Sequence, residues 1–302
     1  MSLLQYDFML RALLGALVTG LTAPALGTYL VQRRLALIGD GIGHVALTGV
    51  GVGLLTGGSP VLTAVLAAAA GAVLVELIRE RGRASGDVAL ALLFYGGISG
   101  GVFLVGLSAD KTSANLTAYL FGSPLTTSRA DLVTMCVLGA VVLGVALLLR
   151  PWLFALCQDE EYARVSGLPV RALNLLLAVT TAVTVTVAMR AVGLLLVSAL
   201  MVVPVATAQQ VTRGFRATMT AAMAIGVLSA AAGIWFAGTY DTAPGATIVL
   251  VAIAAFLSVA VGAGLRRAVR GRRVPGPASG GSGAVAGADQ VPEEQPDVVL
   301  DR

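Results

Sequence analysis

The sequence predicts an all-α membrane protein, a polytopic transmembrane helical bundle of eight or nine spans. Hydrophobic residues make up 57% of the chain and charged residues only 12%, whereas soluble domains contain roughly 45–50% apolar and about 25% charged residues. Apolar runs of about 20 residues, the length that crosses a bilayer as a helix, recur along the chain. Such runs are too long for barrel strands, and in lipid the backbone must be hydrogen-bonded within the segment, so helices are expected.

Eight long apolar runs are the expected spans, and a shorter run over residues 42–55 makes a possible ninth. The first long run lacks a small-residue cleavage site and is followed at once by more spans, so we expect a retained helix and not a signal peptide. The long runs cover residues 8–31, 61–78, 88–107, 132–149, 172–189, 192–211, 217–237 and 246–265.

The basic residues indicate which ends of the spans face the cytoplasm. All but one of the 20 are arginine, and excess arginine marks cytoplasmic loops. Arg11 and the pair Arg33 and Arg34 flank opposite ends of the first run, so the side of the N-terminus stays open. The remaining clusters predict a cytoplasmic C-terminus: Arg79, Arg81 and Arg83; Arg150, Arg164 and Arg171; Arg213 and Arg216; Arg266, Arg267, Arg270, Arg272 and Arg273.

The chain divides by composition into a membrane domain, residues 1–270, and a cytoplasmic tail, residues 271–302. The tail is rich in Gly, Pro, Ser, Ala and acids, with too few apolar residues to bury a core, so we expect it to be disordered. We expect membrane lipid to surround the membrane domain. Nucleic acid is not expected as a partner, because no soluble domain is present to carry a basic face.

The most informative polar residues are Asp40 and His44, the latter being the only histidine in the chain. Residues four apart share one face of a helix, so the two side chains can converge on one ion. Carboxylate oxygen and imidazole nitrogen suit zinc, manganese or ferrous iron. One chain supplies only two ligands, but a symmetric homodimer with this helix beside its axis would supply four. The alternatives are an Asp–His hydrogen bond or a helix cap at Asp40.

A second polar segment lies between two spans, at residues 151–169. Asp159, Glu160 and Glu161 provide an acidic start that suits a helix N-terminus, and Gly167 begins a Gly-x-Pro stop. The segment predicts a short helix that either docks on a partner protein or simply connects the two spans in solvent.

Several kinds of catalytic chemistry lack their residues. The sequence has no phosphate-binding GxxxxGK[ST] loop, and its single lysine, Lys111, stands outside any such motif. It also has no GxSxG elbow and no HExxH pair, so neither a serine hydrolase nor a zinc protease is expected. Cys136 and Cys157 are far apart and form no CxxC or Cys/His cluster, so we interpret them as incidental thiols. The chain is therefore not expected to be an enzyme by itself.

Several collinear stretches resemble the permease subunits of bacterial zinc and manganese ABC importers, those of the high-affinity zinc-uptake type most of all. The resemblance covers roughly residues 5–265. The stretches are LVQRR at residues 30–34, GDGIGHVALTGV at 39–50, AYLFG at 118–122, DEEYARVSG at 159–167, VGLLLVSALMVVPVATA at 192–208 and YDT at 240–242.

The resemblance implies a type II-like ABC importer permease in the bacterial cell membrane. Such a permease works as a homodimer with a cytoplasmic ATP-binding subunit, which hydrolyses the ATP, and an extracytoplasmic metal-binding protein. Asp40 and His44 would line the metal path as a gate. No permanently bound cofactor is implied. The segment that would couple to the ATPase contains Asp159, Glu160, Glu161, Ala163 and Gly167.

Zinc is the cargo expected from the resemblance and from ligand softness. Import of manganese or iron by the same alternating-access mechanism is the main alternative. A permease for metal chelates and a secondary transporter that needs no ATPase are the others.

Overall fold

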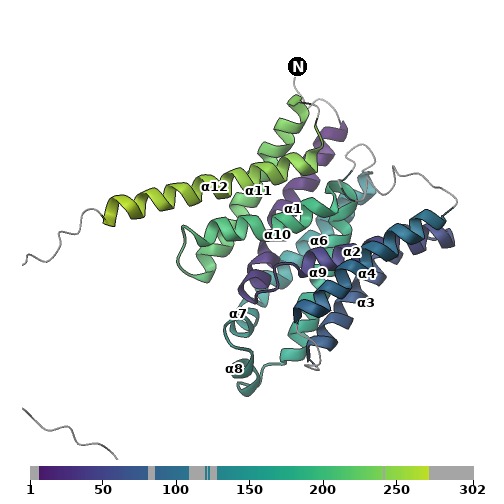
Figure 1. Cartoon of the computed structure of the whole chain (residues 1–302), viewed down its shortest axis with the longest axis horizontal. Coiled ribbons are helices and arrows are strands. Elements are labelled where there is room, and N and C mark those ends of the chain that lie inside the picture. The colour runs from purple at the N-terminus through teal and green to yellow at the C-terminus, as the bar shows by residue number, and fades with distance from the viewer. Residues whose placement is uncertain are drawn as a thin grey trace, which may run out of the picture. The chain divides into compact units, whose positions relative to one another are not determined.

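The computed structural model describes residues 7–80, 86–108, 120, 122, 128–240 and 242–271. All the regular secondary structure in this part of the chain is helical, which confirms the predicted all-α class. The helices are α1 (Asp7–Gln32), α2 (Ile38–Thr56), α3 (Pro60–Glu80), α4 (Gly86–Leu107), α6 (Arg129–Leu148), α7 (Arg150–Gln158), α8 (Glu160–Val165), α9 (Val170–Val192), α10 (Leu194–Gln209), α11 (Phe215–Tyr240) and α12 (Pro244–Gly271) (Figure 1).

Eight of the described helices are long and apolar enough to cross a membrane, and α10 is a shorter apolar helix. The structure reverses two predictions of helix length: the run expected to be short forms a full span, and one expected span forms a short helix. The run at 42–55, expected to be short, is the 19-residue helix α2, because the helix extends through the polar Asp40 to Ile38. The expected span at 192–211 is shortened to the 16 residues of α10. Gly193, with a φ of 89°, lies between the end of α9 and the start of α10 and separates the two helices.

The arrangement of the helix ends assigns a direction to the first span. An ion pair joins Arg33, just after α1, to Glu160 in α8, and another joins Glu80 of α3 to Arg171 of α9. These helix ends therefore share one side of the bundle. Because this is the arginine-rich side, it is the cytoplasmic side by the positive-inside rule. Helix α1 thus begins at the outer side, a point that the flanking charges alone left open.

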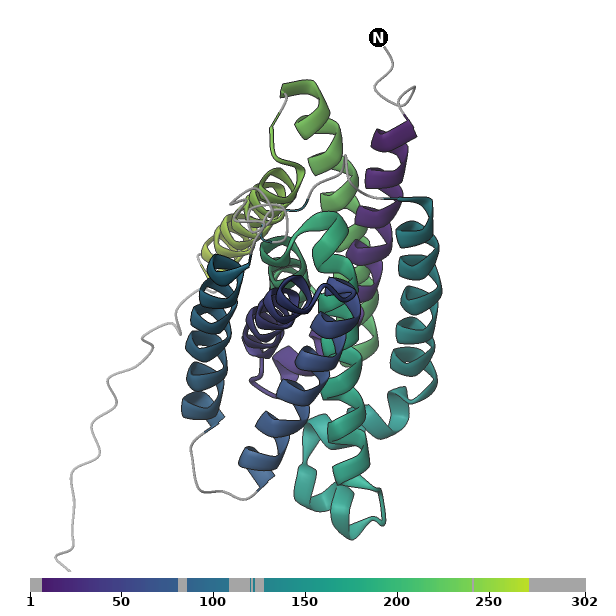
Figure 2. The same ribbon diagram turned by 90° about the vertical axis from the view of Figure 1, so that its right-hand side faces the viewer.

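Helix α2 lies inside the bundle, with α3, α4 and α9 packed around it (Figures 1 and 2). In the most apolar stretches of α2 and α9, 67% of the residues are buried, compared with 22% for α4 and α6. A second group consists of α1, α10 and α11. The outward faces of α4 and α6 are therefore available to lipid or to another protein chain.

Small residues allow the second group of helices to approach closely. Gly27 of α1 lies against the backbone of Met201 in α10, where an added Cβ atom would overlap the Met201 carbonyl. Buried threonines such as Thr28 and Thr181 donate their hydroxyl groups to the carbonyl four residues earlier, so they leave no unsatisfied donor in the bundle. Close backbone contact replaces the hydrophobic driving force that is absent between helices in lipid.

Two units are distinguished along the chain, residues 1–263 and residues 264–302. The membrane-domain boundary predicted at residue 270 falls within α12, which continues to Gly271. The predicted tail at 271–302 lies, apart from Gly271, outside the described residues, so its disorder stays a prediction.

Gly27→Ala is expected to destabilise the fold, because the new methyl group forces α1 away from α10. Overpacking of this kind costs about 1–3 kcal/mol. Gly144→Ala in α6 is the matched control, since nothing lies within 4 Å of its added Cβ atom. Thermal unfolding of the purified chain should show a lower midpoint for Gly27→Ala than for Gly144→Ala. Equal midpoints would contradict the close α1–α10 contact.

Candidate metal centre

The first turns of α2 carry Asp40 and His44, and neighbouring helices enclose them closely. Gly97 of α4 lies against the backbone of His44, at a distance where an added Cβ would come within 2.6 Å of the His44 carbonyl carbon. On the other side, Gly43 faces the Leu194 side chain of α10. Glycine at these two positions therefore allows α2 to sit between α4 and α10.

Asp40 and His44 lie on one face of α2, as their spacing predicts. The distance from Asp40 Oδ1 to His44 Nε2 is 3.8 Å, too long for a hydrogen bond between the two. Asp40 is not the cap of α2 either, because the N-cap position is Leu37, which makes no side-chain capping bond. Neither of the two alternatives for this pair is therefore seen.

The two polar groups have few partners. Asp40 Oδ1 accepts a hydrogen bond of 3.2 Å from Ser198 Oγ of α10. The His44 ring lies edge-on to Phe94 of α4 at a centroid distance of 4.4 Å. His44 Nδ1 is buried and makes no hydrogen bond within the described part of the chain. A buried polar atom without a partner is costly. Nδ1 is not the nitrogen that faces Asp40: Nε2 is the ring atom 3.8 Å from the carboxylate, so a ligand shared by the two side chains would bind Nε2.

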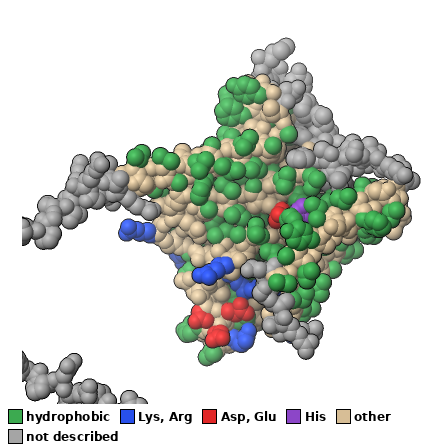
Figure 3. Space-filling model, in the orientation of Figure 1, with side chains coloured by type: hydrophobic (Ala, Val, Ile, Leu, Met, Phe, Trp, Pro, Cys, Tyr) green, Lys and Arg blue, Asp and Glu red, His purple; other side chains and the backbone are tan. Residues whose placement is uncertain are grey.

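Asp40 lines a groove at the surface of the bundle. The groove has a volume of about 380 Å³ and is lined, besides Asp40, by Leu37, Leu90, Ala91, Phe94 and Tyr95. The Asp40 side chain is 25% exposed and that of His44 only 6%. Figure 3 shows the single histidine of the chain (purple) beside an acidic side chain on this face, surrounded by apolar residues. The carboxylate is thus reachable from outside the bundle, with the imidazole behind it.

The described part of one chain does not complete a metal site. No group of three or more His, Cys, Asp or Glu side chains that could hold a metal lies together among the residues that the structure describes. Asp40 and His44 supply one oxygen donor and one nitrogen donor, which is half of a tetrahedral set. The residues present therefore fit a divalent cation as cargo only if further ligands come from elsewhere. The role of both residues as metal ligands stays a prediction.

The predicted coupling segment forms α7 and α8. Asp159 is the N-cap of α8, and its Oδ1 accepts hydrogen bonds from the backbone N–H groups of Glu161 and Tyr162. The helix ends at Val165 with Ser166 as its C-cap, and the next residue, Gly167, has a φ of 80° that suits glycine. Ala163 is fully buried, whereas Glu161 is exposed. The short predicted helix is thus present, with one face on the bundle and the other in solvent.

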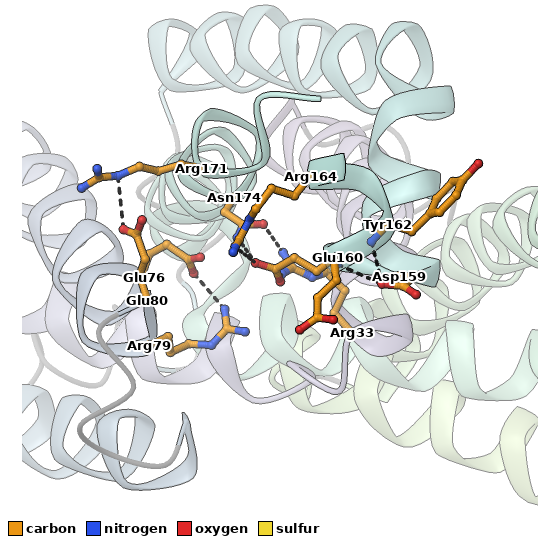
Figure 4. A network of polar contacts seen from close by, with 11 residues as sticks. Arg33, Glu76, Arg79, Glu80, Asp159, Glu160, Tyr162, Arg164, Arg171 and Asn174 are labelled. Atoms are coloured by element: carbon orange, nitrogen blue, oxygen red, sulfur yellow. Dashed lines mark hydrogen bonds and ion pairs between the residues drawn. The ribbon is translucent and has the colours of Figure 1, made fainter. Parts of the chain in front are cut away.

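Glu160 joins α8 to the end of α1 and to α9 (Figure 4). Arg33 Nη2 lies 2.8 Å from Glu160 Oε2, and Arg33 Nη1 donates to Asn174 Oδ1 at 2.6 Å. Asn174 Nδ2 donates to Glu160 Oε1 at 3.3 Å, and Arg164 adds an outer contact of 3.7 Å. Only 7% of the Arg33 side chain is exposed. The three buried or half-buried groups therefore satisfy one another.

This network borders a wide cleft at the cytoplasmic end. The cleft has a volume of about 930 Å³ and lies between the end of α3 and the start of α9. Its carboxylates are paired with arginines: Glu76 with Arg79 at 2.8 Å and Glu80 with Arg171 at 3.2 Å (Figure 4). The paired charges make a polar but nearly neutral lining.

Two residues of these sites were not found by sequence reasoning. Ser198 stood in a quoted motif, but a serine within an apolar run gave no sign that it contacts Asp40. Arg33 was considered as an indicator of orientation and stood in a quoted motif, but its contact with Glu160 was not predicted, although a charged residue at the end of a span was a usable signal. The interpretation of Cys157 as an incidental thiol is supported, because burial raises its pKa to about 11 despite the opposing effect of Arg33, and the thiol stays protonated.

A bundle of apolar helices with a carboxylate and an imidazole in an interior span, and with a charged helix at its cytoplasmic end, defines a membrane transport protein. The chain belongs to the ABC 3 transport family, whose model matches residues 5–263. The match covers every helix described here except part of α12.

Relatives and a solved structure agree with this assignment. The chain is 34% identical over 257 residues to a probable metal transport system membrane protein of Treponema pallidum, covering 85% of this chain and 96% of that one. It is 34% identical to the manganese transport system membrane protein MntC of Halalkalibacterium halodurans, covering 84% and 87%. It is 29% identical to the high-affinity zinc uptake system membrane protein ZnuB of Haemophilus influenzae, covering 84% and 97%.

The solved structure is PsaBC from Streptococcus pneumoniae in complex with Fab. A chain of it superposes with a TM-score of 0.76 at 27% identity, covering 85% of this chain and 92% of that one. The predicted resemblance is therefore confirmed. The chain is an ABC-type metal permease, a multi-pass protein of the plasma membrane.

Proposed function

We propose that the chain imports divalent metal ions, with zinc as the cargo, and that the ion passes between two copies of the Asp40 and His44 pair. The supporting observation is the position of this pair on one face of the interior helix α2, where His44 Nε2 lies 3.8 Å from Asp40 Oδ1. ATP hydrolysis is assigned to a separate cytoplasmic subunit, and delivery of the ion to an extracytoplasmic metal-binding protein.

The dimer is proposed to form across the face that carries the groove beside Asp40. This face is apolar, and Leu37 and Tyr95 at its rim are both exposed. A two-fold axis here brings two carboxylates and two imidazoles together. The resulting four donors match the tetrahedral preference of zinc. A rocking motion of the two subunits then separates the ligands and releases the ion.

Family membership does not identify the transported metal, so the choice of zinc is a separate proposal. Named relatives transport manganese in one case and zinc in another, so the names alone do not decide. Two imidazoles among four ligands favour zinc, whereas manganese prefers more oxygen donors. Import of manganese or iron through the same site is the second candidate, because Asp40 and the Ser198 hydroxyl supply oxygen.

The coupling path is proposed to run from α8 through Arg33 to α2. Movement of an ATPase subunit docked on α8 displaces Glu160, which is bonded to Arg33 at the end of α1. The connection from Arg33 to the start of α2 at Ile38 is short, and Arg34 turns it with a φ of 60°. A displacement of Arg33 therefore reaches Asp40 within the first turn of the next helix.

His44→Ala is expected to lower metal uptake by at least about tenfold, because it removes one of the donors that hold the ion. Even substitutions of residues that only hydrogen-bond to a metal ligand lower metal affinity or activity by about 10–100-fold. Uptake of zinc into vesicles that contain the complete importer is the measurement, with manganese and ferrous iron as competitors. Thr56→Ala, at the far end of α2, is the control. Normal uptake by His44→Ala would remove this residue from the mechanism, and stronger competition by manganese would reassign the cargo.

Tyr95→Cys is expected to cross-link two copies of the chain, because the proposed axis passes beside the groove. The two native cysteines are first replaced by serine, and a short thiol-reactive cross-linker is applied to the assembled importer in its membrane. Val137→Cys, at an exposed position of α6, is the control. Dimers formed through Val137→Cys and not through Tyr95→Cys would place the axis on the wrong side of the bundle.

Glu160→Gln is expected to uncouple ATP hydrolysis from transport, because it weakens the contact that ties α8 to Arg33. The measurement is the number of ions moved per ATP hydrolysed, which should fall about tenfold while hydrolysis continues. Glu80→Gln, which loses a more exposed ion pair at the same end, should change the ratio little, since exposed pairs contribute about 0–1 kcal/mol. A proportional loss of hydrolysis and transport would show that Glu160 serves only to dock the ATPase.

A further inference from the structure

A second cavity at the cytoplasmic end has a chemistry unlike that of the cleft in Figure 4. It has a volume of about 590 Å³ and lies between the start of α7 and the start of α11. Three arginines line it, Arg150, Arg213 and Arg216, together with the rings of Phe154 and Phe215. The two rings lie 5.0 Å apart between centroids. We refer to it as the basic pocket.

The three arginines of the basic pocket have no carboxylate partner among the described residues, unlike four other arginines at this end. Arg33, Arg79, Arg164 and Arg171 are all paired with glutamates. No acidic residue lines the basic pocket, and none of its three arginines forms an ion pair within the described ranges. The pocket is therefore a local concentration of positive charge that the rest of the described chain does not neutralise.

The backbone adds further donors to the basic pocket. The first intrahelical hydrogen bond of α11 runs from the Thr218 N–H to the Gly214 carbonyl. The N–H groups of the preceding turn, at Phe215, Arg216 and Ala217, therefore have no partner within the helix, and all three residues line the pocket. Guanidinium groups and free N–H groups at a helix N-terminus together suit a phosphate group.

The basic pocket also has an apolar wall, formed by the rings of Phe154 and Phe215. Nearby in the chain, Leu148 is 80% exposed and Trp152 of α7 is 51% exposed, although neither lines the pocket. Tryptophan is typical of the membrane–water interface, which favours this depth for the start of α7. A ligand in the pocket can therefore place a phosphate against the arginines and its glycerol and upper acyl carbons against the two rings. A soluble phosphate compound would use the first of these features and not the second.

We propose that the basic pocket binds the headgroup of an anionic phospholipid of the cytoplasmic leaflet. Its phosphodiester accepts hydrogen bonds from Arg213, Arg216 and the first turn of α11, and its glycerol and upper acyl carbons rest on Phe154 and Phe215. Basic pockets between transmembrane helices on this side bind such headgroups. The lipid would fix the loop between α10 and α11 relative to α7.

The test measures which lipid the full chain retains. The chain is purified in a mixture of phosphatidylglycerol and phosphatidylcholine with identical acyl chains, and native mass spectrometry identifies the bound lipid. The wild type should retain phosphatidylglycerol selectively. The double variant Arg213→Gln/Arg216→Gln should lower the preference on the order of thirtyfold, since each basic residue near an anionic membrane contributes about fivefold. Both side chains are exposed, so the variant should fold, which circular dichroism checks.

The matched control is Arg164→Gln/Arg171→Gln, which removes the same charge from two exposed arginines at the same end but outside the pocket. It should keep the preference. Equal loss in both variants would mean nonspecific attraction and overturn the proposal. Displacement of the lipid by glycerol phosphate or inorganic phosphate at equal concentration would make the pocket a soluble-phosphate site. Unchanged lipid retention with lost binding of the ATPase subunit would make it a protein-docking surface instead. Either result would contradict the assignment to lipid.

Discussion

A partly exposed carboxylate and a buried imidazole on an interior membrane helix are the constraint on which the proposed transport site depends. Polar groups in such a position are costly unless they have partners. Asp40 receives one hydrogen bond, from Ser198, and His44 Nδ1 receives none among the described residues. The pair is therefore incomplete within one chain. In the proposed function, a cation and a second copy of the pair complete it, and this proposal connects the site to the dimer and to the transported ion.

The position of α2 links this site to the cytoplasmic end. Glycine at positions 43 and 97 lets α2 pack tightly between α10 and α4, so the helix moves with its neighbours and not independently of them. At its start, a short connection leads back to Arg33, which is nearly buried and bonded to both Glu160 and Asn174. Removing the Glu160 charge would leave the nearly buried Arg33 with Asn174 as its remaining partner, whereas removing Arg33 would leave Glu160 partly exposed to solvent. A contact of this kind is suited to transmitting movement between α8 and α2.

The sequence predicted the fold class and most spans, because the length and hydrophobicity of a segment are set locally. It also predicted that Asp40 and His44 share a face, because residues four positions apart are neighbours on the surface of a helix. The exchange between α2 and α10 was not predictable by counting apolar residues, since Asp40 interrupts the first run while Gly193 divides the second by its backbone conformation. The contacts Ser198–Asp40 and Arg33–Glu160 join residues 158 and 127 positions apart, which no local pattern reveals. The dimer, the cargo and the tail stay predictions.

The most direct test of the central claim is the number of metal ions bound per chain in the assembled importer, held in one state by a nonhydrolysable ATP analogue. Equilibrium binding of zinc, with the chain concentration determined independently, gives this number. A site shared across a two-fold axis predicts one ion for every two chains, and its loss when only one of the two chains in a mixed dimer carries Asp40→Asn. One ion for each chain, with half of the binding kept by the mixed dimer, would contradict the account.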